Sequence, residues 1–225
     1  MRAKFLRTNS LSLFFLALFL MAVVAQSVVG LHDYNEEASA HGQDELGWGR
    51  YVRSSEFGVA VLENWQSEWL QFFLFILATV WFLQEGSPES KELDKAGLES
   101  DEDQKVGAHA DARSPAWAAV GGLRTRLYEN SLLIVFGLVF FASWFAQSVT
   151  GWNEYNNDQE AHRESTVSWA TYVTRPDFWE KTLQNWQSEF LAVGTMVVFS
   201  VYLRQRGSPE SKPVGAPHDA TGETG

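Results

Sequence analysis

The chain has 225 residues, a formal net charge of −11 at pH 7 and no cysteine. The missing cysteine excludes disulfide bonds, thiolate metal sites and a cysteine nucleophile. The negative charge disfavours a nucleic-acid partner, which would require a basic face.

Apolar residues are gathered in four segments, and the stretches between the segments are rich in charge. The segments are residues 10–31, 69–83, 131–152 and 190–203. Together with a high content of tryptophan and phenylalanine, this segregation predicts a membrane protein whose main partner is the lipid bilayer.

The first segment, residues 10–31, is predicted to cross the membrane. Basic residues precede it and Val23-Val24-Ala25 resembles a cleavage site, so a cleaved signal peptide is the alternative. An internal repeat argues against cleavage. The matching segment Ser131–Gly151 lies inside the chain and has about 20 apolar residues, the length of a membrane span.

The repeat itself relates residues 9–91 to residues 130–212 without a gap. Three motifs recur unchanged: Ala25–Val28 as Ala146–Val149, Asn64–Glu68 as Asn185–Glu189, and Gly86–Lys91 as Gly207–Lys212. Such self-similarity indicates one structural unit that is built twice.

Outer loops are predicted after each first helix, at residues 32–58 and 152–181, and each carries an acidic residue four positions before a histidine. The pairs are Glu37 with His41 and Asp158 with His162. On a short helix each pair would share a face, where it could bind a divalent metal or respond to pH. Only one histidine per repeat recurs, so a hydrogen bond that shapes the loop is the favoured interpretation, and no metal is expected.

The second helix of each repeat has an apolar run that is too short to cross a membrane. Trp69–Leu83 extends for about 22 Å against a hydrocarbon core of about 30 Å, and Phe190–Leu203 has the same deficit. We therefore predict that each helix begins about five residues earlier, which draws the preceding polar motif into the membrane. Each helix should end at Gly86 or Gly207, because a proline follows two residues later.

A polar layer is predicted at one depth near the outer ends of the spans. The candidate intramembrane polar site comprises Gln26, Ser27, Asn64, Ser67, Glu68, Gln147, Ser148, Asn185, Ser188 and Glu189. Asn64, Ser67 and Glu68 share a helix face at i, i+3 and i+4, so they can all turn inwards together.

An ionisable residue inside a span is a candidate functional group. The predicted partners of Glu68 and Glu189 are the glutamine–serine pairs at the same depth, namely Gln26 with Ser27 and Gln147 with Ser148, or each other. The alternative is that these polar side chains only hold the helices together.

Basic residues are concentrated at the N-terminus, in the middle of the chain and at the C-terminus, and the positive-inside rule places these parts in the cytoplasm. The predicted domains are a two-helix repeat at 5–91, a flexible charged linker at 92–123, a second repeat at 124–212 and a disordered tail at 213–225. The predicted fold is an all-α membrane protein with four transmembrane helices, arranged as two parallel tandem hairpin repeats in the cytoplasmic membrane.

Four motifs stand out in the repeat unit: Gly151–Asn156, the histidine positions 41 and 162, Glu63–Glu68, and Arg204–Ser208. With these motifs the chain resembles an uncharacterised family of bacterial integral membrane proteins, a domain of unknown function. The resemblance covers nearly all of 5–91 and 124–212 and leaves out the linker and the tail. It implies a bacterial membrane location and brings no activity, ligand or catalytic residue.

Two classes of function remain. One is a small transporter, channel or proton-linked sensor that uses Glu68 and Glu189. The alternative is a non-catalytic membrane scaffold or envelope accessory protein, whose repeated Gly-Ser-Pro-Glu-Ser-Lys motif would bind a cytoplasmic partner. No catalytic residue or cofactor is predicted, and enzymatic activity is the weakest expectation. Four spans are few for a pore in one chain, so a homo-oligomer is an open alternative, and the sequence names no ligand or ion.

Overall fold

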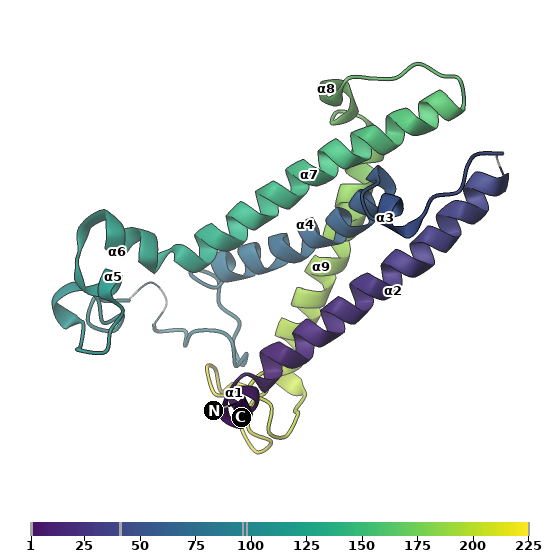
Figure 1. Ribbon diagram of the computed structural model, residues 1–225. Helices are drawn as coiled ribbons and strands as arrows, with labels where there is room; N and C mark the ends of the chain where they lie inside the picture. The colour runs from purple at the N-terminus through teal and green to yellow at the C-terminus, as the bar shows by residue number, and fades with distance from the viewer. Residues whose placement is uncertain (1, 41, 96, 98, 225) are drawn as a thin grey trace. The chain divides into compact units, whose positions relative to one another are not determined.

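The computed structural model describes residues 2–40, 42–95, 97 and 99–224. These residues form helices and turns without a β-strand among them, which confirms the predicted all-α class. In chain order the elements are α1 (Arg2–Thr8), α2 (Ser10–Ala40), α3 (Trp48–Tyr51), α4 (Ser55–Ala78), η1 (Gly107–His109), α5 (Ala116–Ala119), α6 (Gly122–Glu129), α7 (Ser131–Ala161), α8 (Trp169–Tyr172) and α9 (Pro176–Tyr202) (Figure 1).

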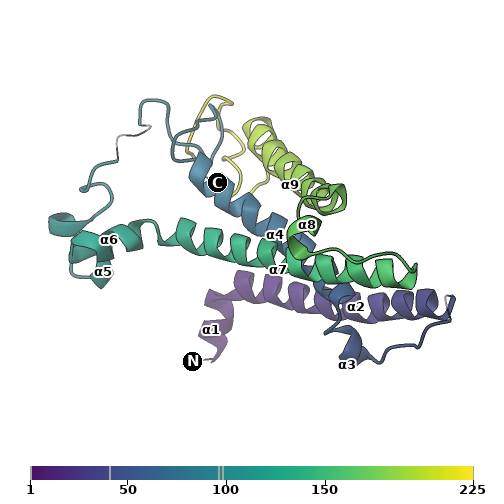
Figure 2. The same ribbon diagram turned by 90° about the horizontal axis from the view of Figure 1, so that it is seen from above.

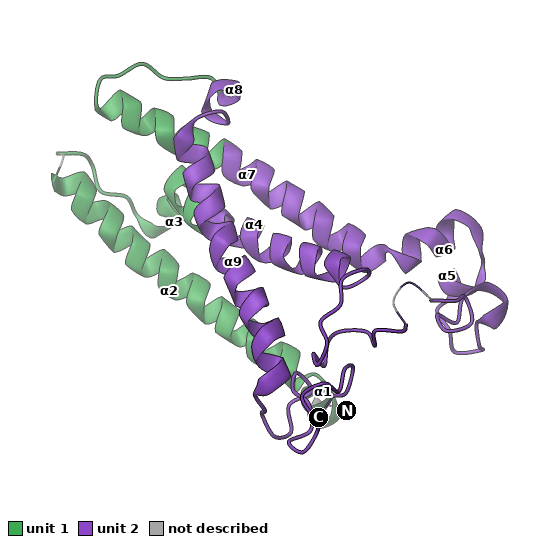
Figure 3. Ribbon diagram, turned by 180° about the vertical axis from the view of Figure 1, so that it is seen from behind, with its two compact units in different colours: residues 1–61, 149–168 green, residues 62–148, 169–225 purple. Residues whose placement is uncertain are grey.

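Two compact units divide the chain, and the division does not follow the repeats (Figure 3). Unit 1 contains residues 1–61 and 149–168, and unit 2 contains residues 62–148 and 169–225. Each unit therefore takes residues from both copies of the repeat.

The first helix of each repeat is longer than predicted. α2 and α7 have 31 residues each, so residues 32–40 and 152–161, which the sequence places in outer loops, are helical. Neither stretch contains glycine or proline. Both helices end close to a residue in the left-handed region, Gly42 with φ of 70° and Arg163 with φ of 58°.

Two of the described helices, α2 and α7, are long and apolar enough to cross a membrane. α2 lies near the N-terminus.

Asparagine side chains shape the loops that follow α2 and α7, and both of these contacts lie in unit 1. The Asn35 side chain donates to the main-chain oxygen of Leu46 at 3.0 Å and accepts from its main-chain nitrogen at 2.8 Å. Asn156 makes the same pair of bonds with Val167, at 3.0 and 2.9 Å. Each loop is therefore held to the end of the long helix before it.

The short helix α3 lies close to α2 in unit 1. Its Tyr51 side chain is buried, with 5% exposed, and faces Gly30. A Cβ atom at residue 30 would overlap the Tyr51 hydroxyl. Glycine is therefore required at this position for the close approach.

Aromatic rings form the interior of unit 2. Trp144 of α7 stacks on Phe140 at a centroid distance of 5.7 Å and contacts Phe178 and Trp186 of α9 at 6.2 and 5.6 Å. Tyr172 of α8 is 1% exposed and meets Phe178 edge-on at 5.7 Å. Offset and edge-to-face pairs of this kind stabilise an interior beyond the area that they bury.

The second helices end earlier than predicted. α4 ends at Ala78 and α9 at Tyr202, whereas the sequence places these ends at Gly86 and Gly207 (Figure 2). After α4 the chain reads Thr-Val-Trp-Phe, and these β-branched and aromatic residues have low helix propensity. The helices begin at Ser55 and Pro176, so the Asn-Trp-Gln-Ser-Glu motif is helical in both copies.

Short helical elements lie in the region that the sequence predicts to be a flexible linker. η1 and α5 fall within it, and α6 leads into α7. The Thr125 hydroxyl of α6 donates to the main-chain oxygen of Trp117 in α5 at 2.7 Å.

Candidate functional site

Two serines of the predicted polar layer hold the short helices α3 and α8. Ser27 and Ser148 are buried, and each accepts a hydrogen bond at 3.0 Å from an indole nitrogen, Trp48 for the first and Trp169 for the second. Each serine also donates to a main-chain oxygen three residues earlier in its own helix. With donor and acceptor both used, these two serines have a structural role.

We expect Ser148→Ala to lower the free energy of unfolding by about 1 kcal/mol, because the Trp169 indole loses its acceptor. Ser27→Ala should have a similar effect through Trp48. Ser188→Ala is the matched control, since Ser188 is exposed and bonds only within its own helix. Unfolding in detergent, followed by tryptophan fluorescence, measures all three. Equal stability of the Ser148 and Ser188 variants would contradict this role.

The glutamines of the layer differ between the copies. Gln26 is exposed and donates to the main-chain oxygen of Ala60 in α4 at 3.3 Å, within unit 1. Gln147 is buried in unit 2, with 2% exposed. Identical residues in the two repeats therefore have different surroundings.

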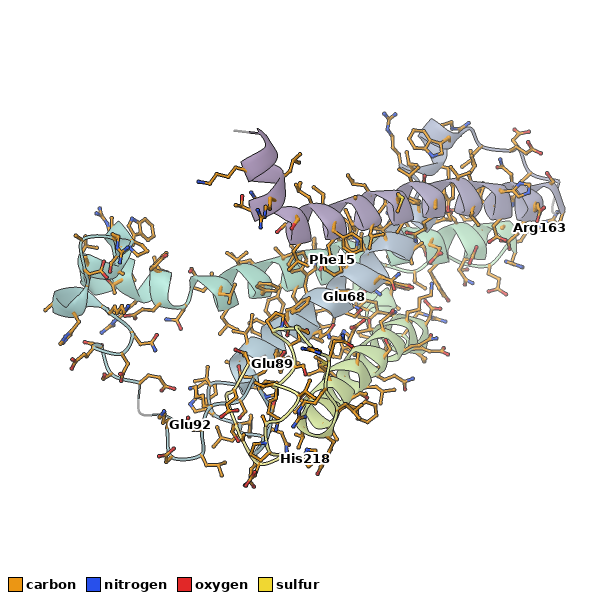
Figure 4. All side chains as sticks on the ribbon, turned by 90° about the horizontal axis from the view of Figure 1, so that it is seen from below. Phe15, Glu68, Glu89, Glu92, Arg163 and His218 are labelled. Carbon is orange, nitrogen blue, oxygen red and sulfur yellow. The ribbon has the colours of Figure 1, made fainter. Side chains whose placement is uncertain are left out.

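Asn64, Ser67 and Glu68, which could share an inward face, differ in exposure. Ser67 is buried, whereas Asn64 and Glu68 are exposed. Figure 4 labels Glu68 on α4. On this part of α4 the buried face carries Gln66 and Ser67, which leaves Asn64 and Glu68 on the exposed face.

Glu189 has a partner in the opposite repeat. The Ser67 hydroxyl donates to Glu189 Oε1 at 3.4 Å and to the main-chain oxygen of Asn64 at 2.9 Å. Glu189 is half-buried. The predicted partners at this depth also included Gln147, Ser148 and Glu68, and of these the Glu68 carboxyl group interacts electrostatically with Glu189.

Asn185 and Ser188 bond to their own helix. The Asn185 side chain donates to the main-chain oxygen of Lys181, and the Ser188 hydroxyl donates to that of Asn185, both at 2.8 Å. Ser67 and Glu189, by contrast, are joined across the two repeats.

Sequence reasoning missed the most deeply buried polar residues of unit 2. Gln66 is 0% exposed, and its side-chain oxygen accepts a hydrogen bond from the Trp186 indole at 2.7 Å. Thr182 of α9 is also 0% exposed. Gln66 stands four residues before the buried Leu70, and this helical spacing is the signal that could have found it.

Several residues that the sequence predicts to lie in the outer loops line an acidic cavity of unit 1. Its volume is about 620 Å³, and its lining includes Glu37, Glu56, Glu154, Asp158, Glu160 and His162. The structure thus brings together three of the four predicted acid–histidine residues, while His41 lies outside the described residues. The His162 Nδ1 atom is 2.8 Å from the main-chain oxygen of Asp158, so the contact uses the backbone of the acidic residue. Across the described residues, no group of three or more His, Asp or Glu is placed to hold a metal ion.

The Gly-Ser-Pro-Glu-Ser motif forms the same turn after each second helix. Gly86 and Gly207 both have φ of 81°, a conformation that favours glycine. The first serine accepts from the main-chain nitrogen of the glutamate, at 3.3 Å in copy one and 3.2 Å in copy two. The second serine accepts from the main-chain nitrogen of Gln84 or Gln205, at 3.0 and 2.9 Å. The turn explains the glycine and both serines, and it makes no use of the glutamate side chain.

A family model described as "Domain of unknown function (DUF6766)" matches residues 2–223. The chain belongs to the DUF6766 family. Comparison with curated proteins and with solved structures gives no match. The DUF6766 match corrects the resemblance drawn from the motifs, because it runs through the linker at 92–123 and most of the tail as well as both repeats.

The DUF6766 match includes a C-terminal segment that the sequence predicts to be disordered. Lys212 is 1% exposed, and its ammonium group donates to three main-chain oxygens of that segment at 2.8 to 3.1 Å, those of Pro217, His218 and Ala220. Burial, followed by the nearby charge of Arg204, lowers the pKa of Lys212. Lys212, the lysine of the second Gly-Ser-Pro-Glu-Ser-Lys motif, therefore holds the C-terminal segment in place within unit 2 through hydrogen bonds.

Proposed function

We propose that this DUF6766 protein is an integral protein of the bacterial cytoplasmic membrane, with four spans and both termini in the cytoplasm, that carries protons or small cations. Apolar side chains cover the outside of the two longest helices, including Phe15 and Leu16 of α2 and Leu138 and Phe145 of α7, each more than half exposed. Apolar surfaces of this extent favour lipid over water.

The second helices are long enough to complete the four spans. α4 has 24 residues and α9 has 27. At 1.5 Å per residue they extend for about 36 and 40 Å, more than the hydrocarbon core of about 30 Å. This length supports the two-hairpin arrangement that the repeat predicts.

The observation that carries the proposal is the hydrogen bond between Ser67 and Glu189. Ionisable residues inside spans are costly, and they commonly mark ion or proton pathways. A serine hydroxyl can donate to a carboxylate and accept from a carboxylic acid, so this contact can persist when Glu189 gains or loses a proton.

The acidic cavity of unit 1 supports the same function. With the loops outside, as the basic residues predict, the carboxyl groups of the cavity face the external solution. A cavity lined by one sign of charge raises the local concentration of the opposite ion. Protons and cations would therefore be enriched at the outer face.

A membrane scaffold is the second candidate. The observation in its favour is that both copies repeat the tryptophan–serine and asparagine–loop hydrogen bonds, all of which hold elements in place. This function would require no movement of ions.

Flux through reconstituted protein tests the proposal. Liposomes that contain the protein and a pH-sensitive dye are given a membrane potential with a potassium ionophore, and proton entry is recorded. We expect Glu189→Gln to reduce the flux to that of protein-free liposomes, because the amide cannot be protonated. Glu180→Gln is the matched control, because Glu180 is an exposed glutamate on the same helix α9, and it should retain the flux.

The proposal would fail if wild-type protein gives no flux above protein-free liposomes, or if Glu189→Gln conducts as wild type does. Unfolding in detergent shows whether the variant is folded. A folded, inactive Glu189→Gln together with an active Glu180→Gln would support transport over the scaffold.

A further inference from the structure

A cleft lies between α4 and α9 in unit 2, next to the turns that follow these helices. It consists of two adjoining cavities of about 230 and 210 Å³, which share Phe75, Val193, Val197 and Glu89 in their walls. The remaining lining is largely apolar and includes Phe72, Phe82 and Met196. Together the cavities fall in the lower part of the size range for small-molecule sites, about 300 to 1,000 Å³.

Two carboxyl groups meet at this cleft. Glu89 lines both cavities and Glu210 lines the second, and their side chains are hydrogen-bonded to each other (Figure 4 labels Glu89). They are the glutamates of the two Gly-Ser-Pro-Glu-Ser motifs, whose turns make no use of either side chain. Burial, then the hydrogen bond and negative charge of Glu210, raise the pKa of Glu89 to about 7. Near neutral pH the pair therefore shares a proton.

The basic groups near the pair are bound elsewhere. The Lys91 ammonium donates to the main-chain oxygen of Val80 and pairs with Glu99. The Lys212 ammonium is used by the C-terminal segment, and the Arg204 guanidinium donates to main-chain oxygens of α9 and of Ala216. Among the residues that line the two cavities, the charged ones are Glu89 and Glu210.

We propose that this cleft binds a lipophilic organic cation, whose apolar groups lie against the phenylalanines and whose charge replaces the proton shared by Glu89 and Glu210. Phenylalanine rings attract cations through their faces. Two carboxylates repel the phosphate of a phospholipid, which is the other amphipathic molecule available in a membrane. The proton leaves to the solvent as the cation binds, so charge is balanced.

This site is separate from the Ser67–Glu189 contact. Binding in the cleft can therefore be measured in detergent whether or not the protein carries protons across a membrane, and either proposal can fail alone.

Tetraphenylphosphonium is a suitable probe, measured by calorimetry with the full-length protein in detergent at pH 6, 7 and 8. We expect binding to strengthen as the pH rises through about 7, with release of a proton seen as a dependence of the heat on the buffer. Glu89→Gln and Glu210→Gln should each weaken binding at pH 8 by about tenfold and remove the pH dependence. Glu85→Gln is the matched control, because Glu85 is an exposed glutamate beside the same turn that does not line the cleft.

Wild-type protein alone also tests the inference, so a folding defect in a variant does not block the test. Tetraphenylborate has the same shape and the opposite charge, and it should not bind. Equal binding of both ions, or binding of the phosphonium that does not change with pH, would show a lipid-like apolar groove and overturn the proposal. Wild-type affinity in Glu89→Gln and Glu210→Gln would overturn it as well.

Discussion

Replacement of Tyr172 by alanine is expected to lower the free energy of unfolding by about 3 to 5 kcal/mol, the cost typical of removing a fully buried aromatic ring. Tyr172 is 1% exposed, and its ring meets Phe178 at 5.7 Å in the aromatic interior of unit 2. The loss combines the lost burial of the ring with the cavity left behind, which rigid neighbouring rings cannot collapse to fill. Unfolding in detergent, followed by the fluorescence of the chain's 10 tryptophans, measures the change.

Tyr172→Phe separates the ring from its hydroxyl group. The hydroxyl donates to Asp177 Oδ2 at 3.3 Å, so the phenylalanine variant should lose only about 1 kcal/mol. Tyr51→Ala makes the equivalent change in copy one, where Tyr51 is 5% exposed and meets Phe57 at 5.5 Å. If Tyr172→Ala is no less stable than Tyr172→Phe, the packing of α8 described above is wrong.

Helix type was predictable from the sequence, and helix ends were not. Apolar runs of membrane-spanning length predict α2 and α7. The sequence predicts loops at their polar ends, residues 32–40 and 152–161, although these residues are helical. Hydropathy indicates which residues are stable in lipid, and it does not indicate where the helical backbone ends. In the same way, Gly86 and Gly207 mark a later turn and not the helix end, because residues between α4 and Gly86 already leave the helix.

The repeat predicts contacts within a copy better than contacts between copies. Hydrogen bonds over short sequence distances are duplicated: Ser27 with Trp48 returns as Ser148 with Trp169. Identical local sequence specifies identical local geometry. The sequence alone could not have paired Ser67 with Glu189, since Ser188 and Glu68, the equivalent residues, are both exposed.

The carboxyl groups show the same limit of sequence-based prediction, because their contacts between the copies depend on the fold. Glu68 and Glu189 are predictable candidates because each directly precedes an apolar run, and Glu189 gains a hydrogen-bond partner from the other repeat, Ser67. Glu89 and Glu210 belong to a motif that the sequence explains as a helix stop, and their pairing emerges only when α4 and α9 are folded in unit 2. The repeat shows which residues are present in both copies. The fold determines in which copy such a residue gains a partner.

Gln66→Leu is the second large effect that we expect, with a loss of about 2 kcal/mol in the free energy of unfolding. Gln66 is 0% exposed and accepts from the Trp186 indole at 2.7 Å, so a leucine of similar size leaves that buried donor without its acceptor. Adding Trp186→Phe removes the donor as well and should restore part of the stability, which a double-mutant cycle measures. Gln187→Leu is the matched control, because Gln187 occupies the same place in the repeat and is exposed. Equal losses for Gln66→Leu and Gln187→Leu would mean that the two repeats are equivalent here, and the asymmetry that singles out Ser67 and Glu189 would lose its support.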